Sequence, residues 1–254
     1  MKKIFNFLFT LILFLFSFYY SKRVLIFIKN KDPLMQEIKS NQNKYFKEPI
    51  NAIITNNTII PGLSGTKLNI NASYQKLKKI KKFDSSSLII DKIKPSISLL
   101  NNYNKYIING NSKKKNISII INTNNLDIIK YYKNTNINFI LSKNDILNNI
   151  NYLNTISNNI IIYQSDLVKL KRINYCYDIN INNPNICSKY NLFTIIPDII
   201  TSNYYYNSIN KLKNGKILCF RVLNNNSLKE LNVLLNSINN LNYKIVSIDE
   251  LIKE

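Results

Sequence analysis

Apolar and polar residues follow one another along this chain in blocks whose lengths predict a regular order of elements. The second half repeats a short apolar run, a polar bend and an amphipathic helical stretch. Seven apolar runs are predicted strands: residues 118–121, 138–141, 160–163, 174–177, 193–196, 217–220 and 243–247. About seven alternating βα units indicate an α/β fold with a parallel sheet and helices outside it, arranged either as a barrel or as an open doubly wound sheet.

Three serines mark expected helix starts in this half. Ser142, Ser227 and Ser247 each precede an amphipathic stretch and have an acidic residue three positions later. A serine hydroxyl at such a position accepts a hydrogen bond from a free backbone N–H of the first helical turn. Helices are therefore expected over residues 143–156, 228–238 and 248–253.

The N-terminus, residues 1–29, has the pattern of a membrane segment. An apolar run at 4–20 follows Lys2 and Lys3, and Lys22 and Arg23 come after it. The run is slightly shorter than the ~20 residues that a spanning helix needs, and no small-residue cleavage site is visible. We expect an uncleaved signal anchor, with a cleaved signal peptide as the alternative. Basic residues on both sides leave the orientation undecided.

Between the anchor and the repeated units lie two further segments. Residues 30–47 are polar and are expected to form a stalk. Residues 48–111 are predicted to be a small α+β segment, with short β-type runs, turns and a basic helix at 73–83. The βα units occupy residues 112–254.

Charge and cysteine content narrow the partners and the compartment. The formal net charge is +21, with 35 basic and 14 acidic residues, which favours an anionic partner such as a wall polymer or lipid. The lysines are dispersed and form no nucleic-acid-binding motif, so nucleic acid is not an expected partner.

Cys176 and Cys187 either form a disulfide outside the cell or remain separate buried thiols, and Cys219 lies in an apolar run expected in the core.

The candidate chemistry lies where the predicted strands end. In "ISIIINTNN", four of the first five residues are isoleucines, so a strand buried on both faces runs into Asn122 and Thr123. In α/β proteins ligands bind at this edge of the sheet. The sequence contains no histidine, which removes the usual general base near neutral pH and the commonest metal ligand.

The C-terminal half of the sequence resembles a polysaccharide deacetylase, or NodB-homology, domain. The stretches "IIPG", "SG", "SY" and "NYNKYIINGN" resemble the N-terminal extension of a membrane-anchored subgroup from low-GC Gram-positive bacteria, and "LKNGKILCFRV" with "NYKIVSIDELIKE" is typical of the end of the domain. The resemblance implies a distorted β/α barrel of the glycoside hydrolase/deacetylase type. It also implies metal-dependent hydrolysis of acetyl groups on an extracellular glycan.

The positions that carry catalysis in the family are substituted in this chain. The family's two aspartates fall on Asn122 and Thr123, its H-x-x-x-H metal ligands on Gln164 and Val168, and its late-strand histidine on Arg221. A divalent ion such as zinc would lack its ligands. The resemblance therefore implies a catalytically degenerate carbohydrate deacetylase without a metal cofactor, in the cell membrane with its barrel outside, binding a cell-envelope glycan.

Two alternatives remain. Asp166, Asp178 and Asp198 follow predicted strands and could face one barrel mouth, where relocated carboxylates would support an active hydrolase; otherwise Asp166 caps a short helix at 167–171 and the other two are loop acids. The tyrosines of 203–207 could stack on sugars. The second alternative is a basic surface protein that binds an anionic wall polymer or lipid. The binding candidates are Asn122, Thr123, Gln164, Asp166, Asp178, Asp198 and Arg221.

Overall fold

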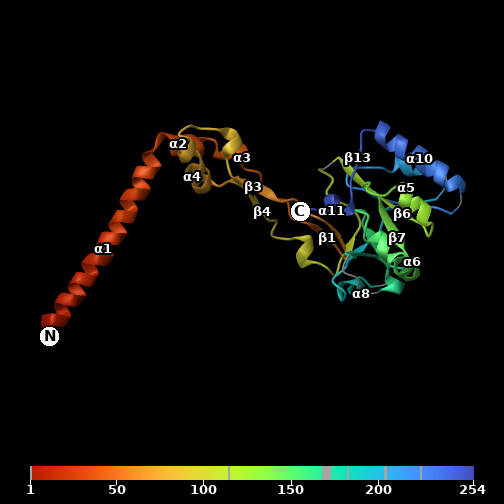
Figure 1. The fold of residues 1–254 in the computed structure, drawn as a ribbon, viewed down its shortest axis with the longest axis horizontal. Coiled ribbons are helices and arrows are strands. Elements are labelled where there is room, and N and C mark those ends of the chain that lie inside the picture. The colour runs from red at the N-terminus through yellow and green to blue at the C-terminus, as the bar shows by residue number, and fades with distance from the viewer. Residues whose placement is uncertain (1, 114, 168–172, 182, 203–204, 224) are drawn as a thin grey trace. The chain divides into compact units, whose positions relative to one another are not determined.

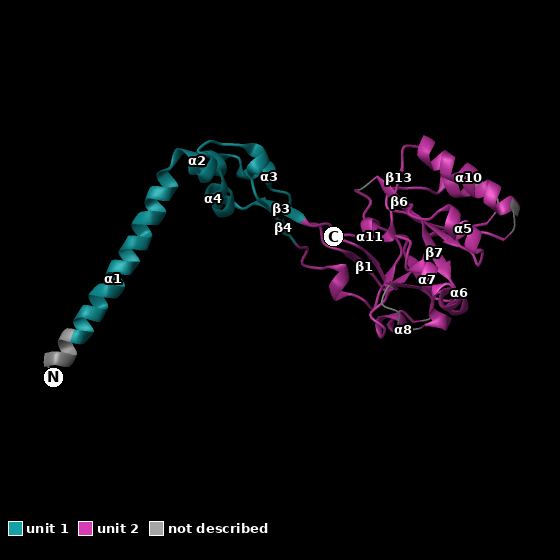
Figure 2. Cartoon of the chain, viewed as in Figure 1, with its two compact units in different colours: residues 1–48, 65–93 teal, residues 49–64, 94–254 magenta. Residues whose placement is uncertain are grey.

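The structure, a computed structural model, describes residues 2–113, 115–167, 173–181, 183–202, 205–223 and 225–254. The chain divides into two compact units, which are described separately (Figure 2). Unit 1 comprises Met1–Glu48 and Gly65–Ile93, and unit 2 comprises Pro49–Ser64 and Lys94–Glu254.

Unit 1 combines a long apolar helix with a small helical and two-stranded body. Its elements are α1 (Lys2–Lys31), α2 (Pro33–Ser40), α3 (Gln42–Tyr45), β3 (Gly65–Leu68), α4 (Ile70–Ile80), η1 (Ser85–Ser87) and β4 (Ile90–Ile93). Strands β3 and β4 pair antiparallel. Residues of the predicted stalk form α2 and α3, and α2 buries Met35 and Ile38 in a cluster with Tyr74 and Leu77 of α4.

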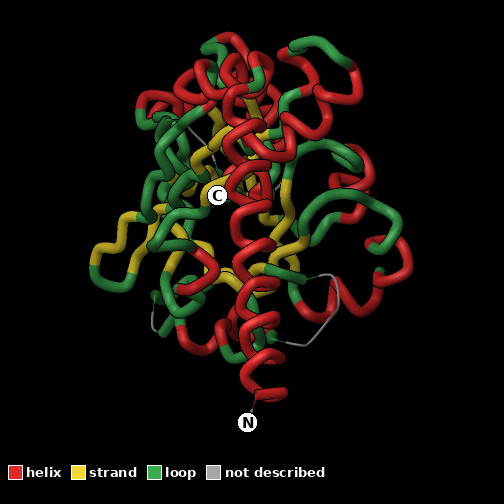
Figure 3. The backbone as a smooth tube through the Cα atoms, turned by 90° about the vertical axis from the view of Figure 1, so that its left-hand side faces the viewer, coloured by secondary structure: helices red, strands yellow, loops and turns green. Residues whose placement is uncertain are grey.

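Unit 2 contains the sheet (Figure 1). Its strands are β1 (Ile53–Thr55), β2 (Thr58–Ile60), β5 (Tyr106–Ile107), β6 (Asn116–Asn122), β7 (Asn138–Leu141), β8 (Ile160–Tyr163), β9 (Tyr175–Tyr177), β10 (Phe193–Ile195), β11 (Ile199–Thr201), β12 (Ile217–Arg221) and β13 (Lys244–Ile245). Its helices are η2 (Leu99–Asn101), α5 (Leu126–Tyr131), α6 (Lys143–Asn148), α7 (Ile150–Leu153), η3 (Gln164–Asp166), α8 (Asn185–Ser188), α9 (Tyr205–Asn210), α10 (Asn225–Asn240) and α11 (Ile248–Leu251). Helical segments join most of the parallel strands (Figure 3).

Seven strands of the C-terminal part of unit 2 pair in parallel, as a ladder, in the order β10-β9-β8-β7-β6-β12-β11. Beyond β10 the short strands β5 and β2 continue the sheet in parallel, and β1 adds to it antiparallel. Strands β10 and β11 lie at opposite ends of this run of seven, yet they are consecutive in the chain, with residues 196–198 between them. Those residues can separate the two strand ends by at most about 14 Å. The ladder therefore curls back on itself, and the predicted distorted barrel of about seven parallel strands is confirmed.

Strand β6 lies between β7 and β12 and is buried on both faces, as its isoleucines predict. Ile119 and Ile121 pack in one core cluster and Ile120 packs in another, and all three side chains are fully buried. Alternate residues of a strand point to opposite faces, so one cluster lies on each side of the sheet.

The membership of the ladder differs from the prediction in one place. The apolar run at 243–247 yields only the two-residue strand β13, which pairs with β6 outside the ladder. The seventh parallel strand is instead β11, which follows Pro197. A proline has no backbone N–H to donate, so the run at 193–201 divides there into β10 and β11, which pair with different neighbours.

The predicted helix starts hold at two of the three serines. Ser142 Oγ accepts from the N–H of Asp145 at 3.1 Å, and Ser247 Oγ accepts from the N–H of Glu250 at 3.3 Å. Ser227 instead lies inside α10, which already includes Asn225. The helix predicted over 143–156 is interrupted at Asn149 and becomes α6 and α7.

Candidate functional site

A pocket of about 580 Å³ opens at the carboxyl ends of β6, β7, β8 and β12. Its polar lining consists of Asn122, Thr123, Asn124, Ser142, Asn144, Asp145, Tyr163 and Arg221. Three of the predicted binding candidates, Asn122, Thr123 and Arg221, are therefore brought together. The last residues of parallel strands meet at one edge of the sheet, which is why strand ends in the sequence locate this pocket.

Asn122 is held in place by its neighbours. It is the last residue of β6 and lies directly opposite Arg221 of β12 in the parallel register. The hydroxyl of Tyr163 donates to Asn122 Oδ1 at 2.7 Å. Beside it, Thr123 is 5% exposed, and its Oγ1 accepts from the N–H of Asn125 at 3.1 Å. The strand end thus presents neutral amide and hydroxyl groups in fixed orientations.

Arg221 is the basic group of this lining. Its Nε atom is buried and has no hydrogen-bond partner among the described residues. Burial raises the pKa of Tyr177, and a hydrogen bond with Arg221 opposes that rise. Burial likewise raises the pKa of Tyr163. Both phenols therefore stay protonated near neutral pH.

Asp145 is the acidic side chain of the described lining. Its Oδ2 accepts from the hydroxyl of Ser142 at 2.6 Å, while the N–H of Asp145 donates to the same hydroxyl. The carboxylate is therefore part of the cap of α6. Sequence reasoning did not select Asp145, Ser142 or Tyr163 for the pocket, although Tyr163 ends a predicted strand and Ser142 follows one directly.

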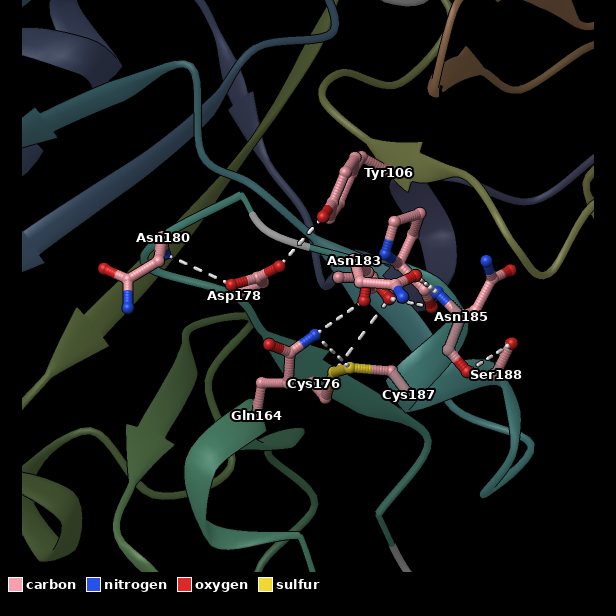
Figure 4. Close-up of a disulfide and its surroundings, with 11 residues drawn as sticks. Tyr106, Gln164, Cys176, Asp178, Asn180, Asn183, Asn185, Cys187 and Ser188 are labelled. Carbon is pink, nitrogen blue, oxygen red and sulfur yellow. Dashed lines mark hydrogen bonds between the residues drawn. A yellow bond between two sulfur atoms is a disulfide. The ribbon is translucent and has the colours of Figure 1, made fainter.

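Gln164 lies outside this pocket. It begins η3, and its Nε2 donates to the backbone carbonyl of Asn183 at 2.9 Å and lies 3.8 Å from Cys187 Sγ (Figure 4). Val168, the other predicted metal-ligand position, lies outside the described residues, as do most of the helix expected at 167–171 and the first two residues of the tyrosine stretch at 203–207.

The three candidate aspartates have separate local partners. Asp178 is 2% exposed and accepts from the hydroxyl of Tyr106 at 2.9 Å (Figure 4). Asp166 Oδ2 accepts from the N–H of Lys143 at 3.2 Å. None of the three carboxylates belongs to the described lining of the pocket.

Asp198 lies at the opposite end of β12 from the pocket. It forms an ion pair with Lys216, which directly precedes β12, whereas Arg221 ends that strand. A strand rises about 3.3 Å per residue, so Lys216 and Arg221 are separated by roughly 16 Å along β12. The expectation that all three aspartates face one mouth is therefore wrong for Asp198, because the register of β11 on β12 places it at the amino edge.

The donors at the pocket do not fit a divalent metal ion. Zinc is held by deprotonated thiolates, imidazoles or carboxylates. Asn122 and Thr123 offer only neutral oxygens, and the carboxylate of Asp145 is a single such ligand that already accepts from Ser142. Among the residues that the structure describes, no group of three or more histidine, cysteine, aspartate or glutamate side chains is placed to hold a metal ion.

Cys176 and Cys187 form a disulfide with their Cα atoms 6.3 Å apart, within the usual range for such bridges (Figure 4). The structure thus shows the bridged one of the two arrangements that the sequence left open. Cys219 is a free, fully buried thiol, as expected for a core residue, and burial raises its pKa to about 12.

Comparison with known proteins identifies the fold. No family model matches the chain. A segment of 86 residues is 37% identical to the uncharacterized protein YlxY of Bacillus subtilis (strain 168), covering 34% of this chain and 27% of that protein, so the match spans about a quarter of the relative's length.

Solved structures of BA3943, a CE4 family pseudoenzyme from Bacillus anthracis, match over 88% of this chain. The wild type has a TM-score of 0.58 and 19% identity, with 96% of its chain covered. A mutant with restored enzymatic activity has a TM-score of 0.59 and 19% identity, with 99% of its chain covered. The barrel and these matches together show that the chain has the fold of the CE4 family pseudoenzyme BA3943.

Proposed function

We propose that this chain is a membrane-anchored, deacetylase-like protein that binds a cell-envelope glycan and does not deacetylate it. The observation that supports this proposal is the lining of the pocket at the strand ends. Asn122, Thr123 and Arg221 occupy the positions where the resemblance requires aspartates and a histidine. The CE4 fold is retained while the groups that perform its chemistry are replaced.

The replaced groups explain why hydrolysis is not expected. Deacetylation requires a water molecule activated by a metal ion or by a base that accepts a proton near neutral pH. Amide and hydroxyl side chains do neither, and Asp145 already accepts the hydroxyl hydrogen of Ser142. BA3943, which shares the fold, is itself described as a pseudoenzyme.

The same groups suit sugar recognition. Asn122, Asn144 and Ser142 offer donors and acceptors for sugar hydroxyl and acetamido groups, and Arg221 adds a charged donor whose Nε is unpaired. A charge-assisted hydrogen bond is worth about 1.5–3 kcal/mol, so the arginine is expected to contribute much of the affinity.

The test combines binding and activity on the full chain in detergent. Titration calorimetry with an N-acetylglucosamine oligosaccharide should detect binding, and Arg221→Gln should weaken it about ten-fold. The matched control is Lys216→Gln, which removes one positive charge at the other end of β12 and should leave the affinity unchanged. Acetate release from the same oligosaccharide, with or without added zinc, is expected to be absent. Metal-dependent acetate release would overturn the proposal.

Membrane anchoring is proposed from α1. Residues Phe7–Lys31 are long and apolar enough to cross a bilayer, and none of the hydrophobic window is buried within the structure. The disulfide in unit 2 favours an oxidising compartment and so a barrel outside the cell. N-terminal sequencing of the membrane-bound protein separates an anchor from a cleaved signal sequence. Cleavage of unit 2 by protease added to intact cells would support the orientation, and protection from the protease would contradict it.

A polyanionic wall polymer is a second candidate partner, and the formal charge of +21 is the observation that favours it. Binding through dispersed lysines depends on screening, so retention on an immobilised anionic polymer should fall steeply as salt rises. Retention that is insensitive to salt would contradict this role and leave the glycan pocket as the remaining candidate.

A further inference from the structure

A basic cleft in unit 1 lies where the apolar helix α1 ends. The cleft has a volume of about 680 Å³ and lies between the last turns of α1 and helix α4. Its lining includes Lys29, Lys31, Asp32, Tyr74 and Lys78. Lys29 and Lys31 come from α1, and Tyr74 and Lys78 come from α4, so two helices supply the charges.

Tyr74 brings two of the lysines together. The Lys29 Nζ lies 5.1 Å from the centre of the Tyr74 ring, and the Lys78 Nζ lies 5.6 Å from it. The ring is 6% exposed and packs in the core of unit 1. Lys29 also donates from Nζ to Asn71 Oδ1 at 2.9 Å. Both ammonium groups therefore lie within about 6 Å of the centre of one buried aromatic ring, and both residues line the same cleft.

The acid of the cleft is already engaged. Asp32 caps α2, accepting from the N–H of Leu34 at 2.9 Å and from the hydroxyl of Tyr74 at 2.6 Å. The hydrogen bond from Tyr74 lowers the pKa of Asp32, so this carboxylate stays ionised while it serves the cap. A second cleft of about 730 Å³ shares Lys29, Tyr74 and Lys78 and adds Lys76 and Lys79. The lysines outnumber the acid, and a net positive charge remains.

The apolar residues beside the cleft indicate what it faces. Three apolar residues of α1 line the cleft: Leu25, Phe27 and Ile28. They are 66%, 59% and 60% exposed, respectively. If α1 crosses a bilayer, these side chains lie in its outer layer and the lysines lie at the level of the headgroups. Phosphate groups are the anions found at that depth.

We propose that this cleft binds the phosphate of an anionic phospholipid headgroup between Lys29 and Lys78, which ties unit 1 to the membrane surface. The inference rests on the anchoring by α1 proposed above. In this proposal the lysines of α4, which lies outside the barrel, bind a lipid headgroup and not a glycan. The neighbouring Lys31 can neutralise a second phosphate oxygen.

The test measures which lipid the full chain retains. The chain, purified in mild detergent, is incubated with equal amounts of phosphatidylglycerol and phosphatidylcholine, and bound lipids are counted by native mass spectrometry. The unchanged chain should prefer phosphatidylglycerol about ten-fold, because each lysine near an anionic headgroup adds a favourable charge interaction. The double variant Lys29→Gln/Lys78→Gln should lose most of this preference, and Lys29→Arg/Lys78→Arg should keep it.

The matched control is Lys81→Gln/Lys82→Gln, which removes the same charge beside the C-terminal end of α4 but outside the described lining of the cleft. It should keep the preference. Equal retention of the two lipids by the unchanged chain, or an equal loss in both glutamine double variants, would overturn the headgroup site. Release of the chain from membranes by alkaline carbonate would instead overturn the anchoring, so the two failures are distinguishable.

Discussion

Five buried or partly buried tyrosines of unit 2 make its stability depend on pH in the alkaline range. Burial is the largest cause of a raised pKa at all five: Tyr106, Tyr132, Tyr163, Tyr175 and Tyr177. For Tyr132 the pKa rises from 10.0 to about 12. The unfolded chain therefore loses this phenolic proton at a lower pH than the folded chain does. The stabilisation is complete below about pH 10 and is lost as the pH rises towards about 12.

Replacing Tyr132 by phenylalanine tests this linkage. The variant should be less stable at neutral pH, because Asn232 Oδ1 loses the hydroxyl that donates to it at 2.6 Å. Its free energy of unfolding should nevertheless fall less steeply between about pH 10 and 12 than that of the unchanged chain. Urea denaturation at several pH values measures both quantities. Tyr190→Phe, at a residue that is 42% exposed, is the control. An unchanged slope in Tyr132→Phe would contradict the assignment.

At the same scale, the sequence located part of the candidate site. Asn122 and Thr123 were predicted because a buried apolar run ends there, and Arg221 was predicted from the family resemblance. The structure places all three in one pocket. Asp145 was predicted as the acidic residue of the helix start at Ser142 but not as part of the pocket, because the pairing of β7 with β6 brings this helix start to the pocket. Asp198 was predicted for the pocket because it follows a strand in the sequence. It lies at the opposite edge of the sheet, because the pairing of β11 with β12 decides which edge it occupies.

Among the elements, Asn138 connects three parts of the barrel. It is fully buried at the start of β7, and its Nδ2 donates to Ser118 Oγ and to the carbonyl of Ile119 in β6, both at 2.9 Å. Its Oδ1 accepts from the N–H of Ile248 at 3.1 Å, at the start of α11. An asparagine that composition alone would assign to the surface thus fixes two strands and a helix.

Asn138→Ala should therefore lower the free energy of unfolding by at least about 2 kcal/mol, since buried backbone and hydroxyl groups lose their partners. Chemical denaturation monitored by circular dichroism measures the change. The exposed Asn239 of α10 supplies the control, and its replacement by alanine should alter stability by less than about 0.5 kcal/mol. Similar losses in both variants would show that the network of Asn138 adds nothing specific.

For the molecule as a whole, the disulfide between Cys176 and Cys187 contributes to stability. It joins Cys176 and Cys187 at a sequence separation of 11, and closing such a loop in the unfolded chain is worth about 2–3 kcal/mol. A reductant should lower the thermal midpoint of the unchanged chain. The double variant Cys176→Ala/Cys187→Ala should start at the lower midpoint and show no response to the reductant.

Calorimetry with and without reductant, together with a thiol count in denaturant, gives the result. One reactive thiol before reduction and three after it are expected, because Cys219 is free. Three reactive thiols in protein isolated without reductant would show that the bridge does not form, and would remove the support it gives to a location outside the cell.

The sequence by itself determined the kind of element at most places, because the periodicity of apolar residues and the serine caps act over a few neighbouring residues. Its resemblance to deacetylases predicts that the catalytic positions of that family fall on Asn122, Thr123, Gln164 and Arg221. Only the tertiary structure decided that β11, and not the run at 243–247, completes the seven-strand ladder, that Cys176 meets Cys187, and that Asp198 lies away from the pocket. Each of these depends on pairing between segments distant in sequence, and the free energy of such pairing is shared by both partners, so neither segment specifies it alone.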